Sequence, residues 1–128
     1  MPFTVLYIED NTDSRILVQR VLESRNYRFI WAANGRDGIN KAIREKPDAI
    51  LLDINLPDID GYEVARKLRA GISNDLLYVP IIAITANALR GDAEKALAAG
   101  CDMYLPKPIN IRDLWDRIEK YLPGENQE

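Results

Sequence analysis

Five side chains that could do chemistry together stand at the ends of short apolar segments of this sequence: Glu9, Asp10, Asp53, Thr85 and Lys107. Three of them are carboxylates, one is a hydroxyl and one is an ammonium. Clustered carboxylates repel one another, so such a group is tolerable only with a cation nearby. Hard oxygen ligands suit Mg²⁺ or Mn²⁺ better than Zn²⁺, and we expect Mg²⁺.

Asp53 is the candidate nucleophile of this group. An ionised carboxylate can attack phosphorus without a general base, and the sequence contains no histidine that could act as one. We expect Asp10, Asp53 and a loop carbonyl to hold the metal, while Lys107 and the Thr85 hydroxyl receive the negative charge that develops on the phosphate. The absence of histidine also excludes serine-type triads, His-bearing zinc sites and a phosphohistidine carrier.

The apolar segments have the length and composition of strands, and amphipathic segments separate them. The predicted strands are Thr4–Ile8, Tyr27–Ala32, the apolar run in the stretch Asp48–Pro57 that brings Asp53 to a strand end, Pro80–Thr85 and Met103–Leu105. The predicted helices run from Asn11 or Thr12 through Leu22, from the turn Asn34-Gly35 to near Pro47, from Tyr62 to about Gly71, through Ala93–Ala99 to Gly100, and over Ile109–Leu122. The first helix is expected to present its apolar residues on one face: Ile16, Leu17, Val21 and Leu22.

Strands that alternate with helices and are apolar throughout predict an open, doubly wound parallel α/β sheet. In such sheets the ligand site lies outside the carboxyl ends of the strands. The five reactive side chains follow those ends, so we expect them to converge on one edge although they are far apart in sequence.

Composition limits the remaining possibilities. A chain of 128 residues, 47% hydrophobic and 29% charged, has the size and balance of one globular domain. Its net charge of -3 gives no case for nucleic-acid binding. No apolar segment is long enough to span a membrane and no signal sequence is present, so neither a membrane nor a nucleic acid is an expected partner. The single cysteine, Cys101, agrees with a reducing compartment, and we expect the cytoplasm.

Four segments, in this order, resemble the receiver domain of two-component response regulators: Val5–Asn11, Ile50–Pro57 with Asp60-Gly61, Ile82–Ala86 and Tyr104–Pro108. The resemblance spans essentially the whole chain. It implies a flavodoxin-like fold of five parallel strands in the order 2-1-3-4-5 with five helices. A receiver domain would occupy residues 1–122, followed by a polar tail at 123–128.

The resemblance also assigns roles to single residues. Asp53 would be the phosphorylation site. Glu9 and Asp10 would be the acidic pair, and the backbone carbonyl of Asn55 would be a metal ligand. Thr85 and Lys107 would sense the phosphoryl group, and Tyr104 would be the switch aromatic. Glu9 stands where most of the family has aspartate. The Lys107–Pro108 bond is expected to be cis. Asn55 and Asn87 occupy positions at which the family tunes dephosphorylation.

By the same likeness the protein is a stoichiometric phosphoacceptor rather than an ordinary enzyme, and it catalyses its own phosphorylation and dephosphorylation. Its phosphoryl donor would be a sensor histidine kinase or a histidine phosphotransfer protein. Phosphorylation would switch the surface of the fourth helix, fifth strand and fifth helix, which binds an unknown downstream protein or a second copy of the chain. The start at Met1 and the short tail favour a stand-alone, single-domain protein.

Taken singly, each residue has a simpler interpretation: Asp53 a turn cap, Lys107 a surface lysine, Thr85 a strand former, Tyr104 the edge of a core. Asp58 and Asp60 are expected to be a loop residue and a helix N-cap, and Trp31 and Trp115 to be packing residues. A flavodoxin-like cofactor binder is disfavoured, because the loop after the first strand begins with two acids. A phosphohydrolase of the haloacid dehalogenase type is disfavoured because residue 55 is Asn. An interaction-only receiver is unexpected because all five reactive positions are intact.

Overall fold

The computed structural model describes residues 2–86 and 91–123. The predicted role of Asn87 and the tail beyond Pro123 lie outside these residues. The strands are β1 (Thr4–Ile8), β2 (Arg28–Ala32), β3 (Ala49–Asp53), β4 (Ile81–Thr85) and β5 (Met103–Pro106). The helices are α1 (Thr12–Glu23), α2 (Gly35–Glu45), α3 (Gly61–Arg69), the 3-10 helix η1 (Asn74–Leu76), α4 (Asp92–Ala98) and α5 (Ile111–Tyr121).

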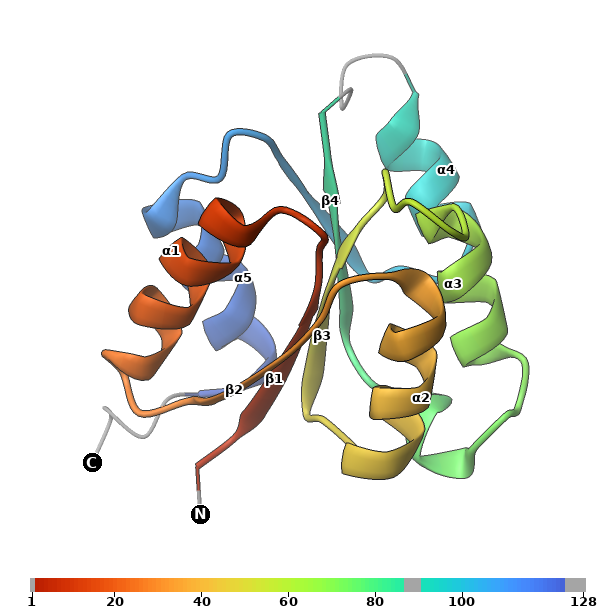
Figure 1. Cartoon of the computed structure of the whole chain (residues 1–128), viewed down its shortest axis with the longest axis horizontal. Helices are drawn as coiled ribbons and strands as arrows, with labels where there is room; N and C mark the ends of the chain where they lie inside the picture. The colour runs from red at the N-terminus through yellow and green to blue at the C-terminus, as the bar shows by residue number, and fades with distance from the viewer. Residues whose placement is uncertain (1, 87–90, 124–128) are drawn as a thin grey trace.

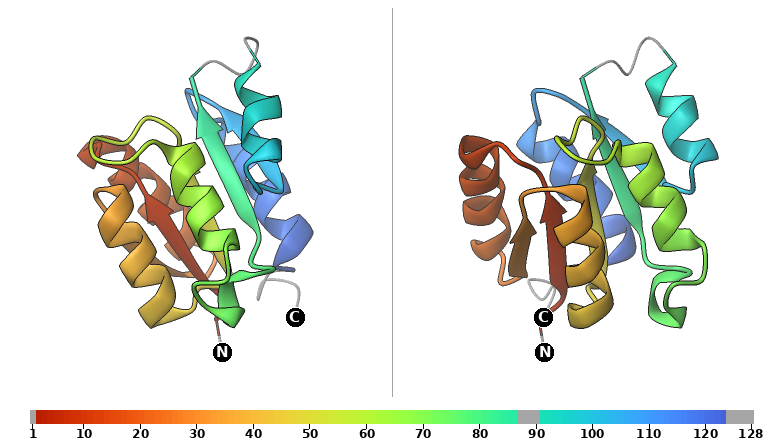
Figure 2. Two further views of the ribbon diagram at one scale, coloured as in Figure 1. Left: turned by 90° about the vertical axis from the view of Figure 1, so that its right-hand side faces the viewer. Right: turned by 45° about the vertical axis from the view of Figure 1, so that its right-hand side comes forward.

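The strands form one parallel sheet in the order β2-β1-β3-β4-β5, which confirms the predicted strand order. Helices α1 and α5 cover one face, and α2, α3 and α4 cover the other (Figures 1 and 2). The predicted doubly wound α/β fold with a flavodoxin-like strand order is therefore confirmed. Within the described residues, no helix combines the length and the apolar character that crossing a membrane requires.

The strands are apolar throughout because both of their faces are covered. In β1, Leu6 and Ile8 contribute to the core under α2, α3 and α4, whereas Val5 and Tyr7 contribute to the core under α1 and α5. The same alternation continues in β3 and β4, as expected from the two-residue period of a strand. This alternation also decides toward which face each side chain at the end of a strand points.

The predicted face of α1 was only half right: Leu22 is buried and Val21 packs against the core, as predicted, but Ile16 and Leu17 do not. The helix buries Val18 and Leu22, one turn apart, whereas Ile16 and Leu17 are 36% and 44% exposed. Residues four apart lie above one another on a helix, so the pair that meets the sheet leaves Ile16 and Leu17 at the edge. The last helix begins at Ile111 rather than at Ile109, because the Asn110 side chain caps it by accepting from the backbone of Asp113.

Candidate functional site

The carboxyl ends of four neighbouring strands meet at one edge of the sheet. In the register of the sheet, Asp53 pairs with Ile84, and Thr85 pairs with Pro106. The backbone continues this pairing past β5, since the Lys107 amide donates to the Thr85 carbonyl at 2.9 Å. The topology therefore brings the ends of β1, β3, β4 and β5 to one place.

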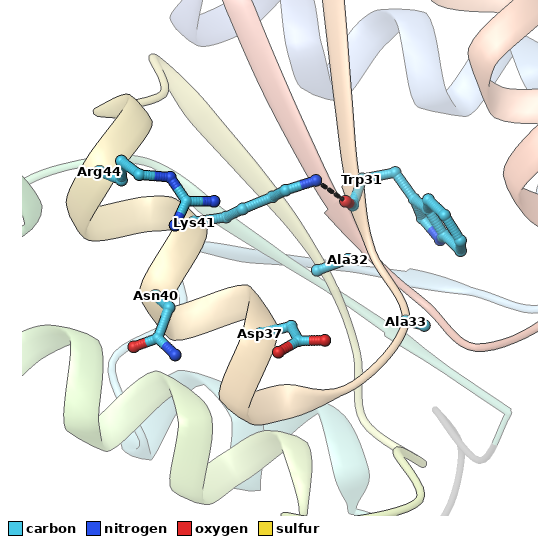
Figure 3. A pocket seen from close by; sticks show the side chains of 7 residues that line it. All are labelled: Trp31, Ala32, Ala33, Asp37, Asn40, Lys41 and Arg44. Carbon is cyan, nitrogen blue, oxygen red and sulfur yellow. Dashed lines mark hydrogen bonds between the residues drawn. The ribbon is translucent and has the colours of Figure 1, made fainter.

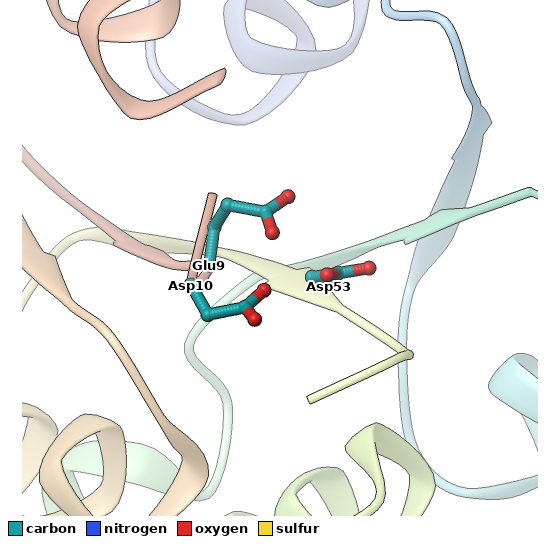
Figure 4. A group of neighbouring side chains, drawn as sticks. All are labelled: Glu9, Asp10 and Asp53. Carbon is teal, nitrogen blue, oxygen red and sulfur yellow. The ribbon is translucent and has the colours of Figure 1, made fainter. Parts of the chain in front are cut away.

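Three carboxylates gather there. Glu9, Asp10 and Asp53 each offer an oxygen, and these oxygens all lie within 4.8 Å of one another (Figure 4). Glu9 and Asp53 are each 1% exposed, whereas Asp10 is open to solvent. A half-buried set of carboxylate oxygens is the donor set that Mg²⁺ binds, so these residues fit the predicted metal.

Lys107 is the cation of the cluster. Its Nζ lies 3.1 Å from Asp53 Oδ1 and 3.4 Å from Glu9 Oε1. Burial opposes the charge of the ammonium, but the carboxylates of Asp53 and Glu9 outweigh burial and raise the pKa of Lys107. Three ionised carboxylates and one ammonium sum to a charge of about -2, which a divalent cation would balance.

Glu9 is held by groups that sequence reasoning missed. The Tyr7 hydroxyl donates to Glu9 Oε1 at 3.1 Å, and the Asn11 amide donates to Glu9 Oε2 at 3.2 Å. Burial, and then the charge of Glu9, raise the pKa of Tyr7, so the phenol remains a donor. The contact between Tyr7 and Glu9 could have been predicted from the sequence, because residues two apart on a strand point to the same face of the sheet.

Trp31, at the end of β2, also reaches the acidic pair. Its indole Nε1 donates to the Glu9 carbonyl at 2.9 Å, and the Arg15 guanidinium lies 4.1 Å from the ring centroid. Trp31 was predicted to be a packing residue, and this contact to the acidic segment was missed.

A pocket of about 380 Å³ lies on the other side of Trp31, between the end of β2 and α2 (Figure 3). Lys41 Nζ donates to the Trp31 carbonyl there at 2.7 Å. Its lining contains none of the predicted site residues: Trp31, Ala32, Ala33, Asp37, Asn40, Lys41 and Arg44.

The loop after β3 is fixed by local hydrogen bonds. The Asn55 amide donates to Asp53 Oδ1 at 3.2 Å, which places Asn55 beside the cluster. Asp60 caps α3, as predicted, by accepting from the Tyr62 amide at 2.7 Å. At Gly61 a Cβ would lie 2.5 Å from the Ile54 Cα, so only glycine lets α3 begin this close to β3.

Asp58 lies in the same loop, as predicted, but it also binds the start of α2, which was not predicted. Its two carboxylate oxygens accept from the amides of Gly35 at 2.7 Å and Arg36 at 3.0 Å, the first two residues of α2. Some loss of hydration opposes ionisation of this exposed carboxyl, but the backbone donors outweigh it and lower the pKa of Asp58. The loop that follows the candidate nucleophile is therefore fastened to the start of α2.

Thr85 points away from the carboxylates. It is fully buried, and its hydroxyl donates to Asp92 Oδ2, at the start of α4, at 2.9 Å. Tyr104, on the neighbouring strand β5, is 37% exposed. The Lys107–Pro108 bond is cis, as predicted.

A second pocket, of about 440 Å³, adjoins the site on the α1 side. Its lining contains Ser14 and Leu17 of α1 together with Lys107, Pro108 and Ile109. Because Lys107 belongs both to this pocket and to the acidic cluster, a molecule seated in the pocket would be next to Asp53.

Comparison with known proteins gives a consistent result. Residues 5–119 match the family described as response regulator receiver domain. The polar-differentiation response regulator DivK of Brucella anthropi is 36% identical over 122 residues, covering 95% of this chain and 98% of that protein.

Two solved structures are also similar. The receiver domain of the sensor histidine kinase PA1611 from Pseudomonas aeruginosa, solved with a magnesium ion coordinated in the active site cleft, has a TM-score of 0.87 and 37% identity, covering 96% of this chain and 99% of that one. The chemotaxis protein CheY4 of Vibrio cholerae has a TM-score of 0.88 and 26% identity, covering 95% of this chain and 100% of that one.

Proposed function

This chain belongs to the response regulator receiver family of two-component signalling, and on that premise we propose that Asp53 accepts a phosphoryl group from a phosphohistidine. The observation that carries the proposal is the ammonium of Lys107, 3.1 Å from Asp53, within a cluster of three carboxylates. The ammonium lies where it can receive the negative charge of a phosphoryl group on Asp53, whose carboxylate is the proposed nucleophile.

In the proposed reaction a carboxylate oxygen of Asp53 attacks phosphorus, and the phosphorus–nitrogen bond of the donor breaks. The electron pair leaves with the imidazole nitrogen, so the products are an acyl phosphate and a histidine. Lys107 offers its positive charge to the phosphoryl oxygens as negative charge develops on them. Each chain takes up one phosphoryl group, and later attack by water regenerates the aspartate, so the protein is a stoichiometric phosphoacceptor.

Mg²⁺ is the proposed cofactor. Glu9, Asp10 and Asp53 would hold it, with the backbone carbonyl of Asn55 as a further ligand. When bound, the ion would neutralise the charge that otherwise repels an incoming phosphate.

The donor is proposed to be a sensor histidine kinase or a histidine phosphotransfer protein that docks on α1. Ile16 and Leu17 are exposed there, and Leu17 lines the pocket that also contains Lys107. Exposed apolar side chains beside a reactive centre suit a partner that must reach that centre. We place this encounter in the cytoplasm, because a single cysteine suits a reducing compartment.

The output surface is proposed to lie on α4, β5 and α5. Each of these elements has one exposed large apolar residue among those described: Leu97, Tyr104 and Ile111. A downstream protein would bind this surface after phosphorylation, with Thr85 and Tyr104 as the switch residues, and a second copy of the chain is the other proposed occupant.

Intact-mass measurement tests the reaction. Incubation of the chain with acetyl phosphate and Mg²⁺ should add one phosphate, and Asp53→Asn or excess EDTA should abolish the adduct. The conservative variant Asp116→Asn, on the exposed side of α5, should behave as the wild type. An adduct of equal yield in Asp53→Asn would contradict the proposal, and no adduct on the wild type would favour an interaction-only receiver.

A further inference from the structure

Thr85 is engaged on the side of the sheet opposite to the carboxylates. Along β4, Ile81 and Ala83 belong to the core under α2, α3 and α4, and Thr85 continues that alternation. Along β3, Ala49 and Leu51 belong to the core on the other face. Asp53, two residues after Leu51, points to that same face. The Thr85 hydroxyl is therefore directed to the α4 side, where Asp92 Oδ2 accepts its proton at 2.9 Å.

The acceptor Asp92 is held at the junction of three elements. It is the first residue of α4, it is partly buried, and it bonds to the last residue of β4. The Tyr62 hydroxyl of α3 is buried nearby. Burial, and then the neighbouring Asp92 carboxylate, raise the pKa of Tyr62 to about 12, so this phenol stays neutral.

From this geometry we propose that Asp92 is a positioning residue that competes with the phosphorylated Asp53 for the single hydroxyl proton of Thr85. The inference rests on the proposed function, because it concerns the response of Thr85 to a phosphoryl group on Asp53. A hydroxyl has one proton to donate, so Thr85 cannot serve both anions at once. The strength of the bond between Thr85 and Asp92 then opposes the phosphorylated state.

Weakening this bond should make the phosphoryl state easier to reach. In Asp92→Asn the acceptor is neutral and nearly the same size, and a hydrogen bond to a neutral acceptor is weaker than one to a carboxylate. Beryllofluoride, which stands in for the phosphoryl group on an aspartate, should therefore bind Asp92→Asn about fivefold more tightly than it binds the wild type at fixed Mg²⁺.

Loss of the negative charge of Asp92 could also strengthen the binding of the beryllofluoride anion without involving Thr85, so two controls are needed. Glu94→Gln removes a charge two residues further along α4, from an exposed position, and should leave beryllofluoride affinity within about twofold of the wild type. In a Thr85→Ala background the competition is absent, so adding Asp92→Asn should give little further gain.

The experiment is a calorimetric titration of beryllofluoride, in Mg²⁺, into the wild type, Asp92→Asn, Asp92→Ala, Glu94→Gln, Thr85→Ala and the double variant Thr85→Ala/Asp92→Asn. Circular dichroism checks that each variant is folded, and Asp92→Ala serves if Asp92→Asn does not fold. Equal or weaker binding by the Asp92 variants, or an undiminished gain in the Thr85→Ala background, would overturn the inference and leave the proposed function intact. Failure of the wild type to bind beryllofluoride would overturn the proposed function and the inference with it.

Discussion

At the scale of single residues, Lys107 would support the proposed nucleophile and compete with the proposed Mg²⁺ for the same carboxylates. Its ammonium already satisfies part of the negative charge of Glu9 and Asp53. A divalent cation entering the same cluster is repelled by it. In Lys107→Met we therefore expect Mg²⁺ to bind about tenfold more tightly while phosphorylation by acetyl phosphate becomes slower.

Calorimetric Mg²⁺ titrations and the rate of adduct formation would measure these two effects, with Lys120→Met, at an exposed position of α5, as the control. Because the pKa of Lys107 is raised above its ordinary value of 10.5, the ammonium keeps its proton throughout the neutral range. The difference in Mg²⁺ affinity between Lys107→Met and the wild type should then be the same at about pH 7 and pH 9. A weaker Mg²⁺ affinity in Lys107→Met would contradict this account.

Trp31 acts on the acidic pair through the backbone. Its indole N–H bonds to the Glu9 carbonyl, so it helps to fix the segment that presents Glu9 and Asp10. Trp31→Phe keeps the ring and loses the donor. We expect its Mg²⁺ affinity to fall about fivefold, which corresponds to about one neutral hydrogen bond.

Trp115→Phe is the matched control for Trp31→Phe. Each indole has an arginine guanidinium 4.1 Å from its centroid, Arg15 at Trp31 and Arg25 at Trp115. Trp115, on α5, stacks on Tyr27, whereas the indole of Trp31 bonds to the Glu9 carbonyl. A calorimetric Mg²⁺ titration should distinguish the two variants. An equal affinity in both would mean that the bond from Trp31 to Glu9 has no part in metal binding.

At the scale of the elements, Asp58 joins the loop after β3 to the start of α2. Its two oxygens accept from two successive amides, so Asp58→Asn keeps one acceptor and turns an NH₂ group toward the other amide. We expect Asp58→Asn to lower the free energy of unfolding by about 1 kcal/mol at neutral pH, discounted for the exposure of the side chain.

The pH dependence of this difference has a definite sign. The folded pKa of Asp58 is lowered from 3.8, so its stabilising effect is complete above that value and is lost as the pH falls through the folded pKa. Urea unfolding of Asp58→Asn and the wild type should show a smaller difference in the free energy of unfolding at about pH 3 than at neutral pH. Asp116→Asn should show no gap at either pH, and a gap for Asp58→Asn that widens in acid would contradict the account.

The elements also show what the sequence could predict. Strands buried on both faces need continuous apolar runs, and those runs located β1, β3 and β4 and thus Glu9, Asp53 and Thr85. Half of the predicted face of α1 was mistaken, because Val18 and Leu17 are both apolar and only the docking angle of the helix decides which of them is buried. Trp31 and Asp92 were missed because their contacts depend on how separate elements meet, a property that no local pattern contains. The contact of Tyr7 with Glu9 was predictable, since residues two apart on a strand share a face.

At the scale of the whole molecule, the doubly wound topology separates two surfaces that share one reactive edge. Helix α1 lies on one face of the sheet and α4 on the other (Figure 1). Successive side chains along each strand alternate between these two faces. Under the proposed function, a phosphoryl donor would approach over α1, while the Thr85 hydroxyl bonds to Asp92 at the start of α4. The two surfaces can be mutated independently, which makes the proposed division testable.

Leu17→Asp tests the donor surface. Leu17 is 44% exposed and shares a pocket with Lys107, but it makes none of the contacts that hold the carboxylates. Transfer from a phosphorylated histidine phosphotransfer protein, chosen because it phosphorylates the wild type, should slow about tenfold, since a charge would enter an apolar contact. Phosphorylation by acetyl phosphate, which is too small to use that contact, should keep its wild-type rate.

Ile72→Asp supplies the comparison, because Ile72 is similarly exposed, at 46%, but follows α3 in the segment that leads to η1. Both rates should stay at the wild-type level in Ile72→Asp. If Leu17→Asp slowed both donors equally, the substitution would have damaged the reactive edge itself. If it slowed neither, the donor would have to approach Asp53 over a different face, and the exposure of Ile16 and Leu17 would need another explanation.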